Sequence, residues 1–169
     1  MDEDTSYTDE KGRTRWRRND EVAGLLKELA DYLVVGGYEP SHAARYPKLA
    51  YAVSRMPESV VALHREGRLR EIPGVGETVA GIIGELVETG TTRKTRESSD
   101  GFVPPPLSVL EMTRLPGLGA LTARRLYAEY GIESLDALRD ALDAGMLDDF
   151  RGLGPKLRDA IRAGAAATA

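Results

Sequence analysis

Three short segments of the sequence carry the same residue types at the same spacing, each centred on a G-x-G turn. They read IPGVGETVAGII from Ile72, LPGLGALTARRL from Leu115 and FRGLGPKLRDAI from Phe150. In each segment an apolar helix end leads into the turn and a second amphipathic helix pattern follows it directly. The repeated unit is therefore predicted to be helix, tight turn, helix.

The two glycines of each turn have different predicted roles. The first can take the positive φ that a sharp reversal needs, and the second leaves room where another backbone must approach closely. The residue between them is apolar and is expected to fix the turn to the core. The turn residues are Gly74, Val75 and Gly76 in the first copy, Gly117, Leu118 and Gly119 in the second, and Gly152, Leu153 and Gly154 in the third.

The start of the helix after each turn is predicted to bind a phosphate group. The first amides of a helix have no partner within the helix, and the helix dipole favours negative charge beside them. Such contacts grip the sugar-phosphate backbone, so they imply DNA binding without sequence readout. One G-x-G turn could be no more than a tight corner between helices, but three copies favour DNA. The side chains expected to assist the amides are Thr78, Arg124, Arg125 and Lys156.

The residues around each turn indicate how well that copy is expected to bind phosphate. Glu77 begins the helix of the first copy, where a carboxylate suits the helix dipole but repels phosphate. Arg68 and Arg70 precede that turn and could compensate. The third copy is the weakest, because Arg151 stands where the other two copies have proline.

The rest of the sequence predicts an all-α protein with two small helical modules. Apolar residues recur at helical spacing from Asp20 to the Gly36-Gly37 pair, with Asn19 or Asp20 as the cap. Another helix is expected to start at Pro47, and no strand pattern is found. The expected divisions are a flexible charged tail over 1–19, a first module over 20–90, a linker over 91–106, a second module over 107–164 and a tail over 165–169. In the first tail, RTRWRR could instead stack on bases.

Composition narrows the classes of protein. The chain has 169 residues and no cysteine, which excludes disulfides and thiolate metal sites, and His42 and His64 stand far apart without other ligands. No apolar run resembles a signal peptide or a membrane span, so we expect a cytoplasmic protein that does not enter a membrane. The net charge of -4 means that DNA contacts must depend on local geometry and local basic residues.

The turns are helix-hairpin-helix motifs, and their arrangement resembles the N-terminal portion of the X-family DNA polymerases, particularly bacterial and archaeal members. YEPSHAARYPKLAYAV is similar to an N-P-F-R-A-R-A-Y-R-R-A-A segment of that family, IPGVGETVAGIIGELVETG to its first hairpin, and the later copies to its thumb-side hairpins. The resemblance implies that the first module holds the 5′ side of a gap and the second the primer strand. It also implies a K⁺ or Na⁺ ion on carbonyls of Arg70, Ile72 and Val75, and of Thr113, Leu115 and Leu118.

Two departures from the family bear on catalysis. The polymerase palm would follow the third hairpin, where this chain stops, so we expect no nucleotidyl transfer by this polypeptide alone. The lysine with which the family forms a Schiff base falls at Ile82, which has no nucleophile. Lys48 and Lys94 are the lysines close enough in sequence to replace it. No catalytic residue is assigned.

The sequence therefore predicts a non-enzymatic DNA-binding protein that recognises gapped, nicked or flexed duplexes in DNA repair and requires no cofactor beyond the hairpin cation. Three alternatives stay open. The first is a deoxyribose-phosphate lyase with a displaced lysine. The second is the DNA-binding part of a split X-family polymerase, with a separate polymerase or repair protein as partner. The third is a protein-interaction module whose hairpins have become packing corners.

Overall fold

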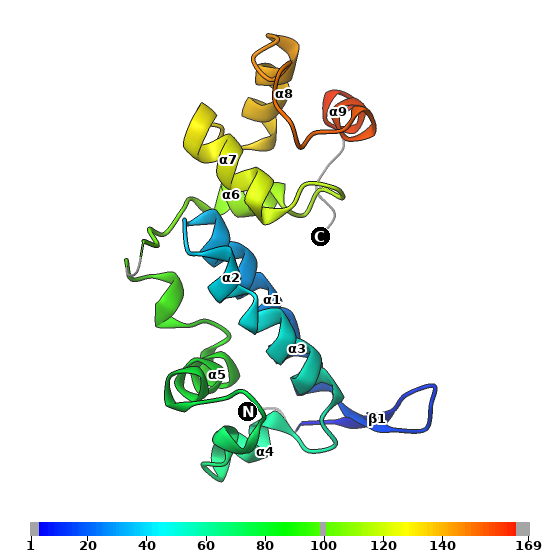
Figure 1. Ribbon diagram of the computed structural model, residues 1–169. Coiled ribbons are helices and arrows are strands. Elements are labelled where there is room, and N and C mark those ends of the chain that lie inside the picture. Colours follow the sequence, from blue (N-terminus) through cyan, green and yellow to red (C-terminus); the bar gives the residue numbers. More distant parts are fainter. Residues whose placement is uncertain (1–3, 99–100, 165–169) are drawn as a thin grey trace. The chain divides into compact units, whose positions relative to one another are not determined.

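The computed structural model describes residues 4–98 and 101–164, and the chain divides into two compact units (Figure 1). The first unit is Met1–Ala30 with Ser41–Ser98, and the second is Asp31–Pro40 with Ser99–Ala169. The structure is mostly helical, which confirms the predicted all-α fold. No helix in the described part of the chain combines the length and the apolar character that crossing a membrane requires. The predicted tail over 165–169 lies outside the described residues.

The first unit combines a β-hairpin with short helices. Helix α1 (Arg17–Val35) is divided between the units: its residues up to Ala30 belong to the first unit and the remaining residues to the second. The other elements, in chain order, are β1 (Ser6–Thr8), β2 (Thr14–Trp16), α2 (Pro40–Ala43), α3 (Arg45–Arg55), α4 (Val60–Arg65), the 3-10 helix η1 (Leu69–Glu71), α5 (Glu77–Thr89) and the 3-10 helix η2 (Arg93–Thr95). Pro47 lies in the first turn of α3, where a missing amide hydrogen costs little.

The second unit contains helices α6 (Leu107–Met112), α7 (Ala120–Tyr130), α8 (Leu135–Asp143) and α9 (Pro155–Arg162). One apolar cluster holds these helices together, and it includes the middle residues of both turns, Leu118 and Leu153. Phe150 joins the same cluster and meets the edge of the Tyr130 ring at a centroid distance of 5.6 Å. The two turns of this unit are therefore anchored directly in its core.

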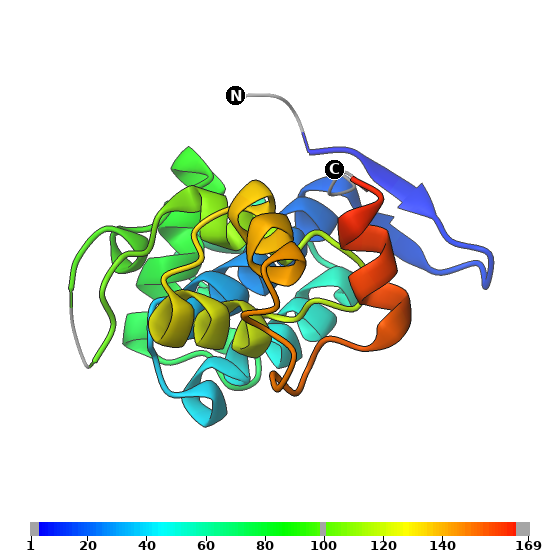
Figure 2. The ribbon, with the colours of Figure 1, turned by 90° about the horizontal axis from the view of Figure 1, so that it is seen from above.

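The N-terminal segment differs from the predicted flexible tail. Strands β1 and β2 pair antiparallel, with Tyr7 opposite Arg15, and their turn points away from the helices of the unit (Figure 2). Asp9 organises this turn by accepting hydrogen bonds from the backbone amides of Lys11 and Arg13 at 2.9 and 3.0 Å. The sequence missed the hairpin because its strands are only three residues long and carry mostly polar side chains.

The first helix starts earlier than the sequence predicts, and Asn19 is not its cap. Helix α1 begins at Arg17, so Asn19 lies inside the helix and is fully buried. Its amide nitrogen donates to the carbonyls of Val53 and Glu58 at 3.1 and 2.9 Å, and its oxygen accepts from the Val60 amide at 2.8 Å. The side chain is used to join the end of α3 to the start of α4 rather than to cap its own helix.

The segment predicted as a linker, 91–106, carries ordered contacts at both ends. Thr92 is buried and caps η2, and Phe102 is buried against the Tyr32 ring at a centroid distance of 5.7 Å. A Cβ atom on Gly36 would overlap the Phe102 ring, so glycine is needed there to admit the aromatic side chain. The Gly36-Gly37 pair ends helix α1, as the sequence predicts.

Candidate nucleic-acid interface

The three turns share one backbone conformation. The first glycines, Gly74, Gly117 and Gly152, have φ values of 84°, 92° and 128°, in the region that favours glycine. The residue after each of them is buried: Val75 is 7% exposed, Leu118 2% and Leu153 5%. Both predictions from the repeated segment are confirmed, and the glycines on either side of the apolar residue face solvent.

The second glycine of each turn has no conformational reason to be glycine. Gly76, Gly119 and Gly154 have φ values of -93°, -82° and -69°, which any residue adopts. A Cβ atom added to any of the three would meet no atom of the described residues within 4 Å, its chain neighbours aside. The fold would therefore accept a side chain at these positions. All three are N-cap residues, where glycine is among the favoured types, and the open space beside each also leaves room for an outside molecule to approach the backbone.

The amides beside these glycines have no partner among the described residues. Gly76 and Gly119 open their helices by accepting hydrogen bonds from Ala80 and Ala123 at 2.9 and 3.0 Å, and no side chain caps either helix. The backbone amides between each glycine and that alanine belong to the first turn of the helix. They point outward and have no acceptor. Such a row of donors at the positive end of a helix dipole suits an anion.

The first turn is surrounded by acidic groups. Glu77 is exposed at the start of α5. Arg68, which could have compensated, lies within 3.3 Å of Glu58, 2.6 Å of Glu66 and 2.9 Å of Glu71. These hydrogen bonds lower the pKa of the Glu71 carboxyl, so it stays ionised. The guanidinium is thus neutralised by neighbours and adds little attraction for phosphate. Thr78 and Arg70 are exposed near the turn.

The second turn has no acidic residue at the start of its helix, but its two predicted arginines are partly used within the unit. Arg124 donates to the carbonyl of Val35 at 3.3 Å. Arg125 donates to the carbonyl of Arg151 at 2.7 Å and lies 4.5 Å from the centre of the Phe150 ring. Both are about half-buried, and Arg125 also lies 3.5 Å from the carboxylate of Glu129, which partly balances its charge.

The third turn lacks one of the amide donors. Pro155 occupies the first position of α9, and proline has no N–H to offer. Arg158 fastens this turn from the inside by donating to the carbonyls of Leu153, Leu147 and Phe150 at 2.8, 2.8 and 3.0 Å. The sequence alone did not indicate this role of Arg158. Lys156 is exposed, and so is Arg151 just before the glycines of this turn.

The carbonyl oxygens that the family resemblance implies for a cation are compatible with that use. Ile72 and Leu115 each accept one hydrogen bond, from Val75 and Leu118 at 3.0 Å, which leaves one lone pair on each oxygen. The remaining carbonyls accept no hydrogen bond from the described residues; these are the carbonyls of Arg70, Val75, Thr113 and Leu118. Carbonyl oxygens are suitable ligands for hard cations.

Ile82, at the position of the family's lyase lysine, is buried on α5 and lines an open pocket of about 470 Å³. Lys94 and Arg93 of η2 line the same pocket, together with the carboxylates of Glu77, Glu85 and Glu97. Lys48, the other lysine considered from the sequence, is exposed on α3 and does not line it. Of the two lysines that the sequence left as alternatives, the structure therefore places Lys94, and not Lys48, at this pocket.

Comparison with known families agrees with this geometry. Residues 17–92 match the model of a helix-hairpin-helix domain, and residues 109–167 match that of a SAM-like helix-hairpin-helix tandem. The protein is thus built from tandem helix-hairpin-helix domains, and these domains imply DNA binding. The chain is also similar to the N-terminal part of an X-family DNA polymerase, the DNA polymerase/3′-5′ exonuclease PolX of Bacillus subtilis (strain 168). The two are 26% identical over 141 residues, which cover 83% of this chain and 24% of that relative.

Proposed function

We propose that this protein binds DNA without sequence readout and selects gapped, nicked or flexed duplexes during DNA repair. The observation that supports this most directly is the second glycine of each turn. Gly76, Gly119 and Gly154 are all exposed, none has a positive φ, each has open space beside it, and each precedes a helix start with unpaired amides, which in the third turn begin after Pro155. A phosphate group approaching the backbone accounts for these properties together.

The second turn is the principal contact in this proposal. No carboxylate stands in the first turn of its helix, and of the two arginines on α7, Arg124 and Arg125, the second is paired with one carboxylate, Glu129 at 3.5 Å. The third turn supplements it through Lys156 with one donor fewer. The first turn is a weaker site, because Glu77 and the carboxylates around Arg68 repel a phosphate. Selectivity for interrupted duplexes follows from hairpins that hold separate stretches of backbone, since a gap or nick lets the duplex bend to meet them.

A K⁺ or Na⁺ ion is part of the same proposal. The resemblance assigns it to the carbonyls of the first and second turns, where the donor set fits a hard cation. When bound, the ion would add a positive charge beside the helix amides. Measuring DNA affinity in K⁺, in Na⁺ and in tetramethylammonium at equal ionic strength tests it. Equal affinity in all three would refute the cation site.

The function is tested by comparing gapped, nicked, intact and single-stranded DNA in fluorescence-anisotropy titrations at low salt. We expect the gapped or nicked duplex to bind most tightly and the sequence of the duplex to have no effect. Because few cations are involved, log affinity should fall with log salt concentration at a slope of about -2 to -4. Failure to bind any of these DNAs at low salt would refute the proposal and favour the protein-interaction alternative.

A second candidate function is removal of deoxyribose phosphate by Lys94, favoured by its place in the pocket that Ile82 lines. The amine would attack the aldehyde carbon of the opened sugar and form an imine with loss of water. Borohydride reduction on an incised abasic duplex would trap this adduct covalently. We expect Lys94→Ala to abolish trapping and Lys48→Ala to preserve it. Absence of any adduct in the unmodified protein would exclude the lyase.

A further inference from the structure

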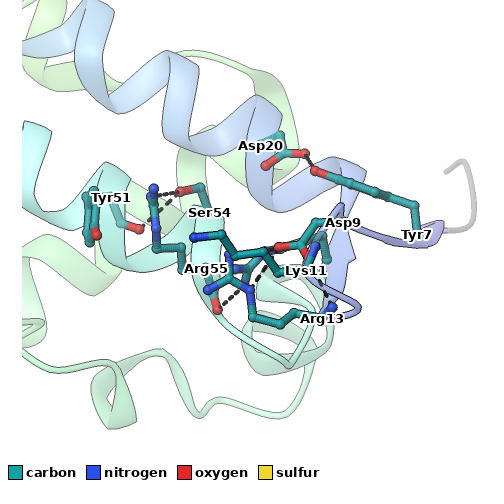
Figure 3. Close-up of polar contacts among 9 residues, drawn as sticks. Tyr7, Asp9, Lys11, Arg13, Asp20, Tyr51, Ser54 and Arg55 are labelled. Atoms are coloured by element: carbon teal, nitrogen blue, oxygen red, sulfur yellow. Dashed lines mark hydrogen bonds and ion pairs between the residues drawn. The ribbon is translucent and has the colours of Figure 1, made fainter.

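The N-terminal β-hairpin forms a polar hollow with α1 and α3 that no part of the proposed function uses (Figure 3). The hollow has a volume of about 250 Å³ and lies within the first unit. Its lining residues are Tyr7, Asp9, Arg13, Arg15, Asp20, Ser54 and Arg55. The strands of the hairpin precede both matched helix-hairpin-helix segments, the first of which begins at residue 17.

The hairpin is held firmly against the helices. The buried Arg15 donates to the carbonyl of Arg55, at the end of α3, at 2.6 Å. The indole of Trp16 donates to the carbonyl of Pro57 at 2.8 Å, and the Tyr7 hydroxyl donates to Asp20 at 2.6 Å. The hollow is therefore a fixed feature of the unit, built by side chains from three elements.

Positive charge predominates in the lining. Asp9 accepts from Arg13 at 3.0 Å and from Arg15 at 3.1 Å, and hydrogen bonds from Arg13 lower its pKa to about 2. The carboxylate therefore stays ionised and partnered at neutral pH, and the lining has one more positive than negative charge. At the hairpin tip, Glu10 and Lys11 offset each other. Arg13 has 53% of its side chain exposed, so it can still meet a ligand.

An exposed aromatic ring lies next to the hollow. Tyr51 on α3 is 62% exposed, and the Arg55 guanidinium lies over its ring at 3.6 Å from the centroid. Because the guanidinium covers one face and the residue remains mostly exposed, the other face is open. A rigid ring backed by a cation is a favourable stacking surface for a nucleobase.

We propose that this surface, formed by Tyr51, Arg55 and Arg13, binds single-stranded DNA. One unpaired base stacks on the open face of Tyr51, and an adjacent phosphate meets Arg55 and Arg13. A single strand is favoured over a duplex because only an unpaired base can expose a face to the ring, and a hollow of this size admits one phosphate group. The inference adds a second contact to the proposed DNA-binding function but depends on different residues.

The test compares two DNA probes: a blunt duplex, and the same duplex with a single-stranded overhang containing 2-aminopurine. We expect the overhang to increase affinity and its fluorescence to be quenched on binding, as stacking requires. Tyr51→Ala should weaken overhang binding roughly tenfold and abolish the quenching. Tyr51→Phe, which keeps the ring, is the matched control and should retain both. Arg13→Glu should weaken overhang binding and leave quenching at saturation intact.

This experiment distinguishes a failure of the single-strand proposal from a failure of the proposed duplex binding by the hairpins. Blunt-duplex affinity should be unchanged in Tyr51→Ala, whereas Gly119→Val should lower it with the quenching signal retained at saturation. If Tyr51→Ala binds the overhang as well as the unmodified protein does, the single-strand surface is wrong even though duplex binding persists. Equal loss for both probes would also overturn it, because that result assigns Tyr51 to folding or to duplex contact. Circular dichroism of each variant detects misfolding.

Discussion

The first and second hairpins have the same turn geometry but opposite electrostatic surroundings. Gly74 and Gly117 have nearly the same φ, and the helices that follow start with the same unpaired amides. Around the first turn, Glu77 is exposed and Arg68 is surrounded by three carboxylates. Near the second, the helix carries two arginines, Arg124 and Arg125, against one paired carboxylate, Glu129. A repeated segment thus fixes where the amides point, whereas the neighbours determine whether an anion is attracted to them.

The largest effect is expected when the helix amides of one turn at a time are blocked by a side chain at the second glycine. Gly119→Val should lower affinity for gapped DNA roughly a hundredfold, because the side chain blocks the amides and about 3 kcal/mol of phosphate contact is lost. Gly76→Val should lower it only slightly. Both variants should keep their helicity, since a Cβ atom at either position has open space among the described residues and both φ values are ordinary. Similar losses for the two variants would show that the hairpins contribute equally.

For the third hairpin, the informative measurement is protein stability rather than affinity for DNA. Arg158→Ala removes three hydrogen bonds from a guanidinium to turn carbonyls, so the free energy of unfolding should fall by roughly 2 kcal/mol in urea titrations. Arg162→Ala, on the same helix with one distant ion-pair contact of 3.7 Å, is the matched control and should change it little. An unchanged unfolding midpoint for Arg158→Ala would mean that the turn holds its shape without this side chain.

Reversing the charge at the first hairpin should bring it closer to the second. Glu77→Lys removes the carboxylate at the helix start and adds a cation, so affinity for gapped DNA should rise roughly three- to fivefold at low salt. The salt dependence should steepen at the same time. Glu133→Lys, in the second unit, changes the net charge equally and is the matched control. An equal gain for both variants would show a general charge effect and no role for this turn.

The smallest expected effect concerns the amide that proline removes from the third hairpin. Pro155→Ala restores an N–H at the first position of α9, so affinity should rise roughly twofold if this turn contacts phosphate. Anisotropy titrations on gapped DNA, run in parallel with Arg158→Ala, measure it. No change in Pro155→Ala would support a purely structural third hairpin.

Local rules in the sequence were enough to predict the turns. Positive φ at the first glycine, burial of the middle residue and the helix that follows all depend on neighbours within a few residues. The second-glycine prediction needs a correction in detail: none of the described residues comes close to a Cβ position on Gly76 or Gly119, so the space there is open to an outside molecule.

The predictions that failed or changed depend on contacts between distant residues. Asn19 was assigned to a helix cap, but its partners Val53 and Val60 are more than thirty positions away. The hairpin was missed because its stability comes from Arg15 and Trp16 meeting carbonyls at the end of α3 and just after it. No periodicity within the N-terminal segment reports such contacts.

The buried amide of Asn19 makes one corner of the first unit sensitive to a single-atom exchange. An amide can give hydrogens to two carbonyls and take one from a backbone N–H at the same time, and the α3–α4 corner uses all three. Aspartate has the same shape, but an ionised oxygen in place of the nitrogen would face two carbonyl oxygens and turn both attractions into repulsions. The corner thus tolerates neither deamidation nor the most conservative-looking replacement.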